Sequence, residues 1–188
     1  MTEAELIAGC RAGHHQAFEE LVKRYHPAVL RVCVSLIGSR DVDDLVQDIF
    51  MKILQRIQTF QGKSALFTWI YEIAINHCRD ELRRRKRRRW FSLQSLPPER
   101  VDQITIDDES VSEQIERSEM HRHLRRAINQ LDPKYRELIV LRDFEGLDYE
   151  AIAKITGITL NLVKSRLYQG RQILAFKMKK YLEEASHG

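Results

Sequence analysis

The chain has 188 residues, of which 43% are apolar and 31% charged, and its net charge is +4. This length suits one medium domain or two small ones, and the apolar content is enough for a buried core. No apolar run approaches the length of a membrane-spanning helix, and residues 1–13 carry acids rather than a basic-then-apolar export signal, so we expect a cytoplasmic protein.

Apolar spacing predicts helices through most of the first half. The stretch 17–37 is apolar at helical steps, with Pro27 marking a kink or a break and Gly38-Ser39 ending the segment. Residues 41–57 have the cleanest amphipathic pattern in the chain, and Asp41 is placed to cap that helix. We therefore expect two packed helices before residue 60.

A loop and a long helix complete the first half. Residues 60–64 surround Gly62 and indicate a loop, after which a helix is expected from about Leu66 to Arg89. Its last seven residues, 83–89, are all basic and would bind phosphate without sequence preference. A disordered basic tail is the alternative interpretation of this run.

The middle of the chain differs in charge and periodicity. Residues 90–110 lose the helical pattern and contain Pro97-Pro98, which indicates an extended linker. Residues 1–90 carry 16 basic and 11 acidic side chains, residues 91–119 carry 2 and 8, and residues 120–188 carry 13 and 8. Two basic blocks around an acidic one predict two nucleic-acid-facing domains and a tether.

The second half is again helical in pattern. A helix is expected over 111–131, and Asp132-Pro133 starts another that ends near Gly146, with proline at a favoured first position. A short helix over 148–156 and a last helix from Leu160 to about Leu182 follow. No strand alternation or internal repeat is present in the sequence.

Residues 148–160 have the pattern of a helix-turn-helix. Asp148 and Thr159 are capping residue types, Ala153 is small where two helices would cross, and Gly157 stands where the first helix must stop. A short turn with glycine suits the steep crossing angle of this motif. We therefore predict a DNA-binding unit in the second half.

The last helix divides into two faces. The apolar side, expected to pack inward, consists of Leu160, Val163, Leu167, Gly170 and Leu174. The other side carries amide, hydroxyl and cationic groups that read bases or grip phosphates, namely Asn161, Lys164, Ser165, Tyr168 and Arg171. Arg166 lies on the flank as a phosphate contact. A helical pair with a solvated polar face, and a half-buried packing role for Tyr168, are the alternatives.

Three stretches in sequence resemble the bacterial RNA polymerase sigma factors of the extracytoplasmic-function (ECF) group, within the sigma-70 family. They are residues 43–50 (DDLVQDIF), residues 60–84 (with QGKS, TWIY, IAIN and DELRR) and residues 149–167 (with YEAIA and VKSRL). Their order and spacing match that family over most of the chain outside the linker. Glu72, Leu66-Phe67 and Asn161-Leu162 depart from the family pattern.

The resemblance implies a role for each stretch. The first implies docking on the β′ clamp of core RNA polymerase through one helix face, consisting of Asp44, Gln47, Asp48 and Met51. The second implies recognition and melting of the promoter minus-10 element by Gln61, Lys63, Ser64, Asn76, Arg79, Arg83 and Arg84. The third implies recognition of the minus-35 element by Asn161, Lys164, Ser165, Arg166, Tyr168 and Arg171. An ordinary solvated helix face is the alternative for the docking residues.

The resulting expectation is an all-α protein of two small helical domains joined by a flexible linker, the C-terminal one a helix-turn-helix. The predicted boundaries are 1–90 for docking and minus-10 recognition, 91–115 for the acidic linker, and 116–188 for minus-35 recognition. The resemblance implies that the protein directs promoter-specific transcription initiation in a stress or envelope response. Its implied partners are core polymerase (β′ clamp and β flap), promoter DNA and an anti-sigma factor.

Catalysis is not expected. The sequence contains no phosphate-cradling glycine loop and no metal-ligand spacing, and the three cysteines are widely spaced, as in reduced and partly buried thiols. We therefore expect no cofactor, no metal and no small-molecule substrate. A stand-alone helix-turn-helix regulator and a purely protein-binding helical adaptor remain as rival functions.

Overall fold

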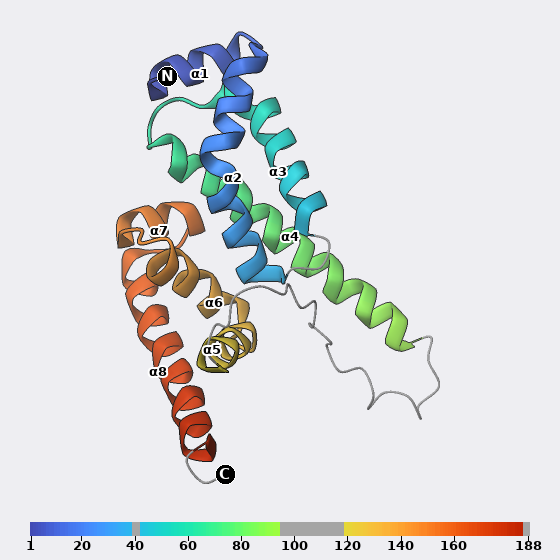
Figure 1. The fold of residues 1–188 in the computed structure, drawn as a ribbon, viewed down its shortest axis with the longest axis vertical. Helices are drawn as coiled ribbons and strands as arrows, with labels where there is room; N and C mark the ends of the chain where they lie inside the picture. Colours follow the sequence, from blue (N-terminus) through green and yellow to red (C-terminus); the bar gives the residue numbers. More distant parts are fainter. Residues whose placement is uncertain (39–41, 95–118, 186–188) are drawn as a thin grey trace.

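The computed structural model describes residues 1–38, 42–94 and 119–185, and every regular element within these ranges is a helix. The first half forms α1 (Glu3–Arg11), α2 (His15–Ile37), α3 (Val42–Arg56), the single turn η1 (Ile57–Thr59) and α4 (Leu66–Gln94). The second half forms α5 (Glu119–Asn129), α6 (Pro133–Ile139), η3 (Val140–Phe144), α7 (Tyr149–Thr156) and α8 (Leu160–Ala185). The predicted all-α fold of two helical domains is confirmed, and Figure 1 shows the two groups, called here the first and second bundles.

The first bundle begins with a well-capped short helix. The Thr2 side chain accepts a hydrogen bond from the Glu5 amide, and the Glu5 carboxylate accepts one from the Thr2 amide at 2.8 Å. Both interactions satisfy amides that have no partner inside the helix. Gly9 lets α1 approach α2 closely, because a Cβ there would lie 2.6 Å from the Ala17 Cβ.

Helix α2 passes through Pro27 without a break, so of the two predictions for this position, a kink or a break, the break is wrong. Proline lacks the amide that would continue the helical ladder and normally costs a helix interior about 3 kcal/mol. Burial of the helix on both sides of it offsets this cost: Leu21 and Val32 are completely buried. The helix ends where expected, at Gly38, whose φ is 86°.

Helices α3 and α4 supply the rest of the first core. Ile49 and Ile53 of α3 are completely buried, as are Ile75 and Cys78 of α4. Asp41, predicted as the cap of α3, lies outside the described residues. Helix α4 continues five residues beyond the predicted end at Arg89, to Gln94, so the loss of periodicity at Trp90 does not end it. Arginine and lysine are good helix formers, and Trp90 remains helical and exposed.

The second bundle follows its predicted elements closely. The Asp132 side chain caps α6 by accepting a hydrogen bond from the Lys134 amide at 3.0 Å, with Pro133 in the first turn. Helix α6 then widens into a π-helical turn, η3, before Gly146. Of the helix expected over 111–131, α5 occupies Glu119–Asn129, and residues 111–118 lie outside the described residues.

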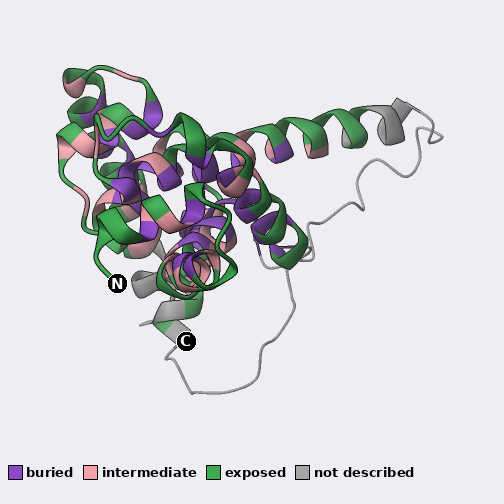
Figure 2. Ribbon diagram, turned by 90° about the horizontal axis from the view of Figure 1, so that it is seen from above, coloured by how far each residue is buried: buried purple, intermediate pink, exposed green. Residues whose placement is uncertain are grey.

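The two bundles pack against one another. Helix α7 lies on α4, and η3, α5 and α6 contact α2, as Figure 1 shows. Buried side chains from both bundles belong to one hydrophobic cluster. Figure 2 shows the buried residues between the bundles. The distal part of α4 projects away from them and is mostly exposed. None of the described helices is both long and apolar enough to cross a lipid bilayer.

Candidate nucleic-acid interface

The helix-turn-helix has the geometry that its sequence predicts. The Asp148 carboxylate caps α7 by accepting a hydrogen bond from the Ala151 amide at 2.6 Å. Gly157 ends that helix with φ 70° and ψ 23°, in the left-handed region where glycine is favoured. Thr159 then caps α8, where its hydroxyl accepts a long hydrogen bond of 3.4 Å from the Leu162 amide.

Helix α8 buries its predicted inner face. Val163 and Leu167 are almost completely buried, and Gly170 is buried against α6. A Cβ at Gly170 would lie 3.1 Å from Ile139 Cδ1 and from Tyr135 Cβ, so the absence of a side chain permits close approach of the two helices. Leu160 and Leu174 are half-buried at either side of this contact.

The outer face of α8 is open to solvent. Exposed side chains there are Asn161, Lys164, Ser165, Tyr168 and Arg171. Tyr168 is 67% exposed, so the alternative of a half-buried packing residue is wrong. Arg166 is half-buried, in agreement with its predicted place on the flank. Amide, cationic and aromatic groups on one exposed face can contact both bases and phosphates.

Arg171 differs from the other members of this face because it is paired within the chain. Its Nε donates to Asp143 Oδ2 at 3.2 Å, and its Nη2 donates to Asp143 Oδ1. The hydrogen bonds to Asp143 raise the pKa of the Arg171 guanidinium. Arg171 therefore reaches a phosphate only by sharing or leaving Asp143. The sequence pattern gave no indication of this ion pair.

The loop between η1 and α4 has an anchored base and an exposed tip. Phe60 is buried, and its ring lies 5.3 Å from that of Trp69 at an interplanar angle of 50°. Gly62 turns the chain with φ 68°. Gln61 and Lys63 are exposed, and Ser64 is half-buried. The loop therefore presents polar groups at an exposed tip and is anchored at its base by the packing of Phe60 against Trp69.

Arg11 fixes this loop, and the sequence analysis missed it. Its guanidinium donates from Nε to the Ile57 carbonyl at 3.4 Å and from Nη2 to the Phe60 carbonyl. In return, Gln58 Nε2 donates to the Arg11 carbonyl at 2.6 Å. The end of α1 therefore holds the start of the loop through contacts more than 45 residues apart in sequence.

The predicted minus-10 residues of α4 are found in two settings. Asn76 is exposed, but its Oδ1 accepts a hydrogen bond of 3.2 Å from Arg79 Nη1. Arg79 is directed at the second bundle, where it pairs with Glu137. Arg83 is exposed beside Asp80, at 3.1 Å. Arg83 is therefore an exposed cation paired within its own helix, whereas Arg79 is paired with the second bundle.

Glu81 organises the start of the basic run. It accepts hydrogen bonds from Arg84 Nε at 2.6 Å and Arg85 Nε at 2.9 Å. Burial alone would raise the pKa of Glu81, but the hydrogen bonds and charges of Arg85 and Arg84 outweigh it and lower that pKa. Arg85 also donates to the Ile37 carbonyl at the end of α2. Part of the predicted phosphate-binding run is therefore structural.

The predicted docking residues share one exposed face of α3. Asp44, Gln47 and Asp48 are exposed, and Met51 is 53% exposed, whereas the opposite face is buried.

His77 of α4 lies next to two side chains of α3, Lys52 and Asp48. Its Nδ1 lies 2.8 Å from Lys52 Nζ, and its Nε2 lies 4.0 Å from Asp48 Oδ2. Burial, and then the Lys52 charge, lower the pKa of His77.

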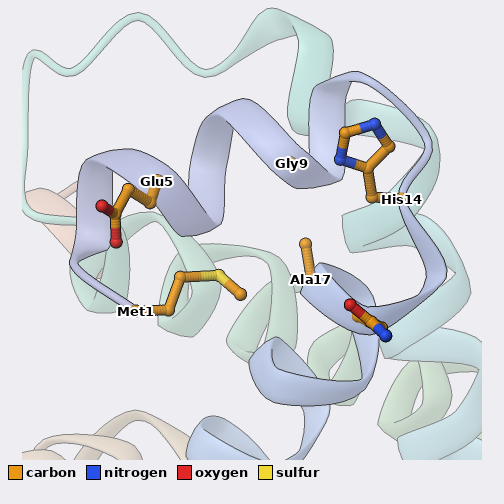
Figure 3. A pocket seen from close by; sticks show the side chains of 6 residues that line it. Met1, Glu5, Gly9, His14 and Ala17 are labelled. Atoms are coloured by element: carbon orange, nitrogen blue, oxygen red, sulfur yellow. The ribbon is translucent and has the colours of Figure 1, made fainter.

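Among the residues that the structure describes, the cysteines and a surface pocket lie outside these faces. Cys10, Cys33 and Cys78 are buried free thiols, fully buried rather than partly buried as expected. Figure 3 shows an open pocket of about 380 Å³ on α1 and the start of α2. Its lining residues are Met1, Glu5, Gly9, His14, Gln16 and Ala17. None of them belongs to a predicted interface, and within the described ranges no group of three His, Cys, Asp or Glu side chains is placed to hold a metal ion.

Comparisons with known proteins match both bundles. The family model for sigma-70 region 2 matches residues 21–88, and that for sigma-70 region 4 matches residues 121–174. The ECF RNA polymerase sigma-E factor of Escherichia coli K12 is 32% identical over 181 residues, which is 95% of each chain. The RNA polymerase sigma-H factor of Pseudomonas aeruginosa is 30% identical over 187 residues, or 97% of each chain.

Solved structures agree in fold. The sigma factor RpoE of Bartonella quintana, in complex with the anti-sigma factor NepR, is 27% identical with a TM-score of 0.70, covering 86% of this chain and 96% of that one. CnrH, in complex with the cytosolic domain of CnrY, has a TM-score of 0.65 at 24% identity, covering 93% and 96%. The likeness to CnrH concerns the fold alone.

Proposed function

The chain belongs to the extracytoplasmic-function group of the sigma-70 family, whose members direct promoter-specific transcription initiation, and we propose how its surfaces divide that work. The exposed face of α3 docks on the clamp of the β′ subunit of core RNA polymerase. The loop 60–64 and α4 recognise and melt the minus-10 element. The outer face of α8 reads the minus-35 element.

The exposed face of α8 is the observation that carries this proposal. Lys164 and Ser165 project into solvent from a helix whose other side is locked by Val163, Leu167 and Gly170. A helix held in this way, behind a capped and turned α7, can enter a major groove without rearranging its own bundle. The acidic face of α3 supports docking on a basic partner helix by charge complementarity.

Melting follows from binding energy rather than catalysis. An unstacked base captured by the polar tip of loop 60–64 is unavailable for re-pairing. The chain uses no cofactor and turns over no small molecule. The β flap of core polymerase is the proposed second contact. An anti-sigma factor is the proposed inhibitor, since the similar sigma factor RpoE of Bartonella quintana is found in complex with the anti-sigma factor NepR. The genes controlled are proposed to belong to a stress or envelope response.

Reconstitution with core RNA polymerase tests docking. The double variant Asp44→Lys/Asp48→Lys reverses the charge of the α3 face, so we expect it to lose core binding and all transcription. Glu19→Lys, which changes an exposed acid of α2, is the matched control and is expected to bind normally. Equal core binding by the double variant and the control would contradict the proposed docking face.

Run-off transcripts from genomic templates test recognition. Sequencing of their start sites should reveal a shared pair of promoter elements. Lys164→Ala is then expected to reduce the salt dependence of promoter binding by about one counterion, whereas Lys23→Ala on α2 leaves it unchanged. Tight binding to duplex DNA by the free chain, with no association with polymerase, would instead favour a stand-alone regulator. Full activity with Lys164→Ala/Arg171→Ala would favour a protein-binding adaptor.

A further inference from the structure

Asp48 and Lys52 stand four residues apart on α3, the spacing at which opposite charges on one helix normally pair. The Lys52 ammonium turns toward α4 instead, where its Nζ lies 2.8 Å from Nδ1 of His77. Both residues belong to the described part of the chain, and no ion pair joins them. The Asp48 side chain is 73% exposed on the proposed docking face. An acid of that face therefore stays unpaired although a cation stands one helical turn away.

The contact between Lys52 and His77 fixes the protonation of the imidazole. An ammonium group can only donate, so Nδ1 must present its lone pair, and the ring is neutral with its proton on Nε2. That Nε2 is buried and has no hydrogen-bond partner in the described structure. Asp48 Oδ2 lies 4.0 Å from it, which is too far for a hydrogen bond. His77 thus holds the cation on one side and leaves the acid unbonded on the other.

Packing between the two helices keeps the imidazole in this place. Cys78 of α4 is completely buried, and so are Ile49 and Ile53 of α3. His77 and Lys52 are half-buried at the edge of that apolar contact. The His77 side chain is only 15% exposed, so the ring has little freedom to leave Lys52. The position of the lysine is therefore set by the core and not by a surface rotamer.

The charges that act on His77 come from α3 and α4. Lys52 and Asp48 face it from α3, and Asp80 and Glu81 belong to its own helix. Burial and the Lys52 charge disfavour a protonated ring, and together they outweigh the three acids and lower the pKa of His77. The neutral ring that accepts from Lys52 is therefore the form present at neutral pH.

We propose that His77 is a positioning residue of the docking face: by holding Lys52, it keeps the Asp48 carboxylate free for a cation of polymerase. The proposal rests on the proposed function, which assigns the exposed face of α3 to docking. Without the imidazole acceptor, the Lys52 ammonium is free to turn to Asp48. A carboxylate already paired within its own helix attracts a partner cation less strongly. His77 therefore acts on docking through Lys52, without touching polymerase itself.

Protonation of His77 should have the same effect as its removal. A protonated ring has no lone pair at Nδ1, so it releases Lys52, and its new charge lies 4.0 Å from Asp48 Oδ2. Both changes neutralise the acid that is used for docking. Because the pKa of the folded ring lies below its ordinary value, the neutral form is lost only below about pH 6.5. Docking should therefore weaken as the pH falls through that range.

Affinity for core polymerase at neutral pH tests the role of Lys52. His77→Leu removes the acceptor and is expected to bind roughly twofold to fivefold more weakly, the range that an exposed ion pair contributes. Adding Lys52→Met removes the competing cation and should restore the parent affinity. Adding Lys23→Met instead, at an exposed lysine of α2, is the matched control and should restore nothing. A chain with His77→Leu and Lys52→Met that binds as weakly as His77→Leu overturns the proposal, because a merely structural histidine predicts no rescue.

The pH profile of docking separates the imidazole from a fixed acceptor. His77→Asn places an amide oxygen near the position of Nδ1, where it can accept from Lys52 but cannot gain a proton. Its affinity at neutral pH should equal that of the parent chain. Below about pH 6.5 the parent should weaken toward the affinity of His77→Leu, whereas His77→Asn should not. The ratio of parent to His77→Asn removes the titration of polymerase itself, and a ratio that stays constant overturns the proposal.

NMR titration of the His77 ring in the free chain distinguishes this inference from the proposed function. Lys52→Met leaves the α4 core intact and should raise the pKa of His77, because the Lys52 charge lowers it, whereas Lys23→Met should not. An unchanged pKa in Lys52→Met overturns the inference, whatever polymerase does. If that pKa rises but Asp44→Lys/Asp48→Lys binds polymerase as well as the parent, the docking face is wrong. The proposed function and the role of His77 in docking then both fail, and the contact between Lys52 and His77 stands.

Discussion

Replacing Arg11 with alanine tests whether the loop proposed to capture a base depends on its anchor at the end of α1. The Arg11 guanidinium donates to the Ile57 carbonyl at 3.4 Å and to the Phe60 carbonyl. Arg11→Ala removes both donors at once. The Gln58 side chain can still donate to the backbone carbonyl at position 11, so the loop loses its charged anchor but keeps one contact.

The size of the effect follows from these contacts. A hydrogen bond to a charged group contributes about 1.5–3 kcal/mol, but the bond to Ile57 is long and the side chain is partly hydrated, so we expect a loss of about 1.5 kcal/mol in unfolding free energy. For a bundle of this size that lowers Tm by roughly 6–12 °C. If this 1.5 kcal/mol also orders the loop for base capture, the equilibrium amount of open promoter complex should decrease about tenfold.

Holoenzymes reconstituted with each variant provide the assay. Promoter melting is measured by the reactivity of unpaired thymines to permanganate, and core binding is measured separately. Arg24→Ala is the matched control, because Arg24 also donates to a backbone carbonyl, that of Met1, but far from the loop in sequence. We expect reduced melting with Arg11→Ala and unchanged core affinity. Melting by Arg11→Ala at the level of Arg24→Ala would refute the reasoning.

Three further outcomes follow from buried or strained positions. Leu167→Ala, at a side chain only 1% exposed, should cost about 2–5 kcal/mol of stability in the second bundle and abolish minus-35 recognition, measured by thermal unfolding and promoter binding. Gly157→Ala forces a side chain into the left-handed region at φ 70° and should lower the unfolding free energy by about 1 kcal/mol in chemical denaturation. Burial and then Lys52 lower the pKa of His77, so the unfolded chain binds its proton first and stability should fall as pH drops below about 6.5; His77→Gln should flatten that part of the pH profile.

Local chemistry explains why the helix-turn-helix could be predicted from the sequence. Asp148 and Gly157 act on their immediate neighbours, and the two faces of α8 repeat at the helical period, so each signal lies within a few residues. The exposed face of α3 follows from the same periodicity. The loop at residues 60–64 was equally evident from Gly62.

Tertiary placement explains what could not be predicted. Arg79 was expected to face DNA, and nothing near it in sequence indicates Glu137, 58 residues away. The same holds for Arg11 and its loop. Pro27 was expected to disturb α2, but the packing of the whole helix overrides a local preference. The boundaries predicted for the linker remain a prediction, except that residues 91–94 belong to α4.

All three cysteine thiols lie inside the first bundle, and no cysteine follows residue 78. The Sγ atoms of Cys33 and Cys78 lie 3.6 Å apart, and both residues are completely buried. A thiol-reactive dye therefore cannot modify the native chain until the packing around these buried thiols opens. The rate of dye incorporation therefore reports how often the interior of the first bundle becomes accessible, and no probe has to be engineered.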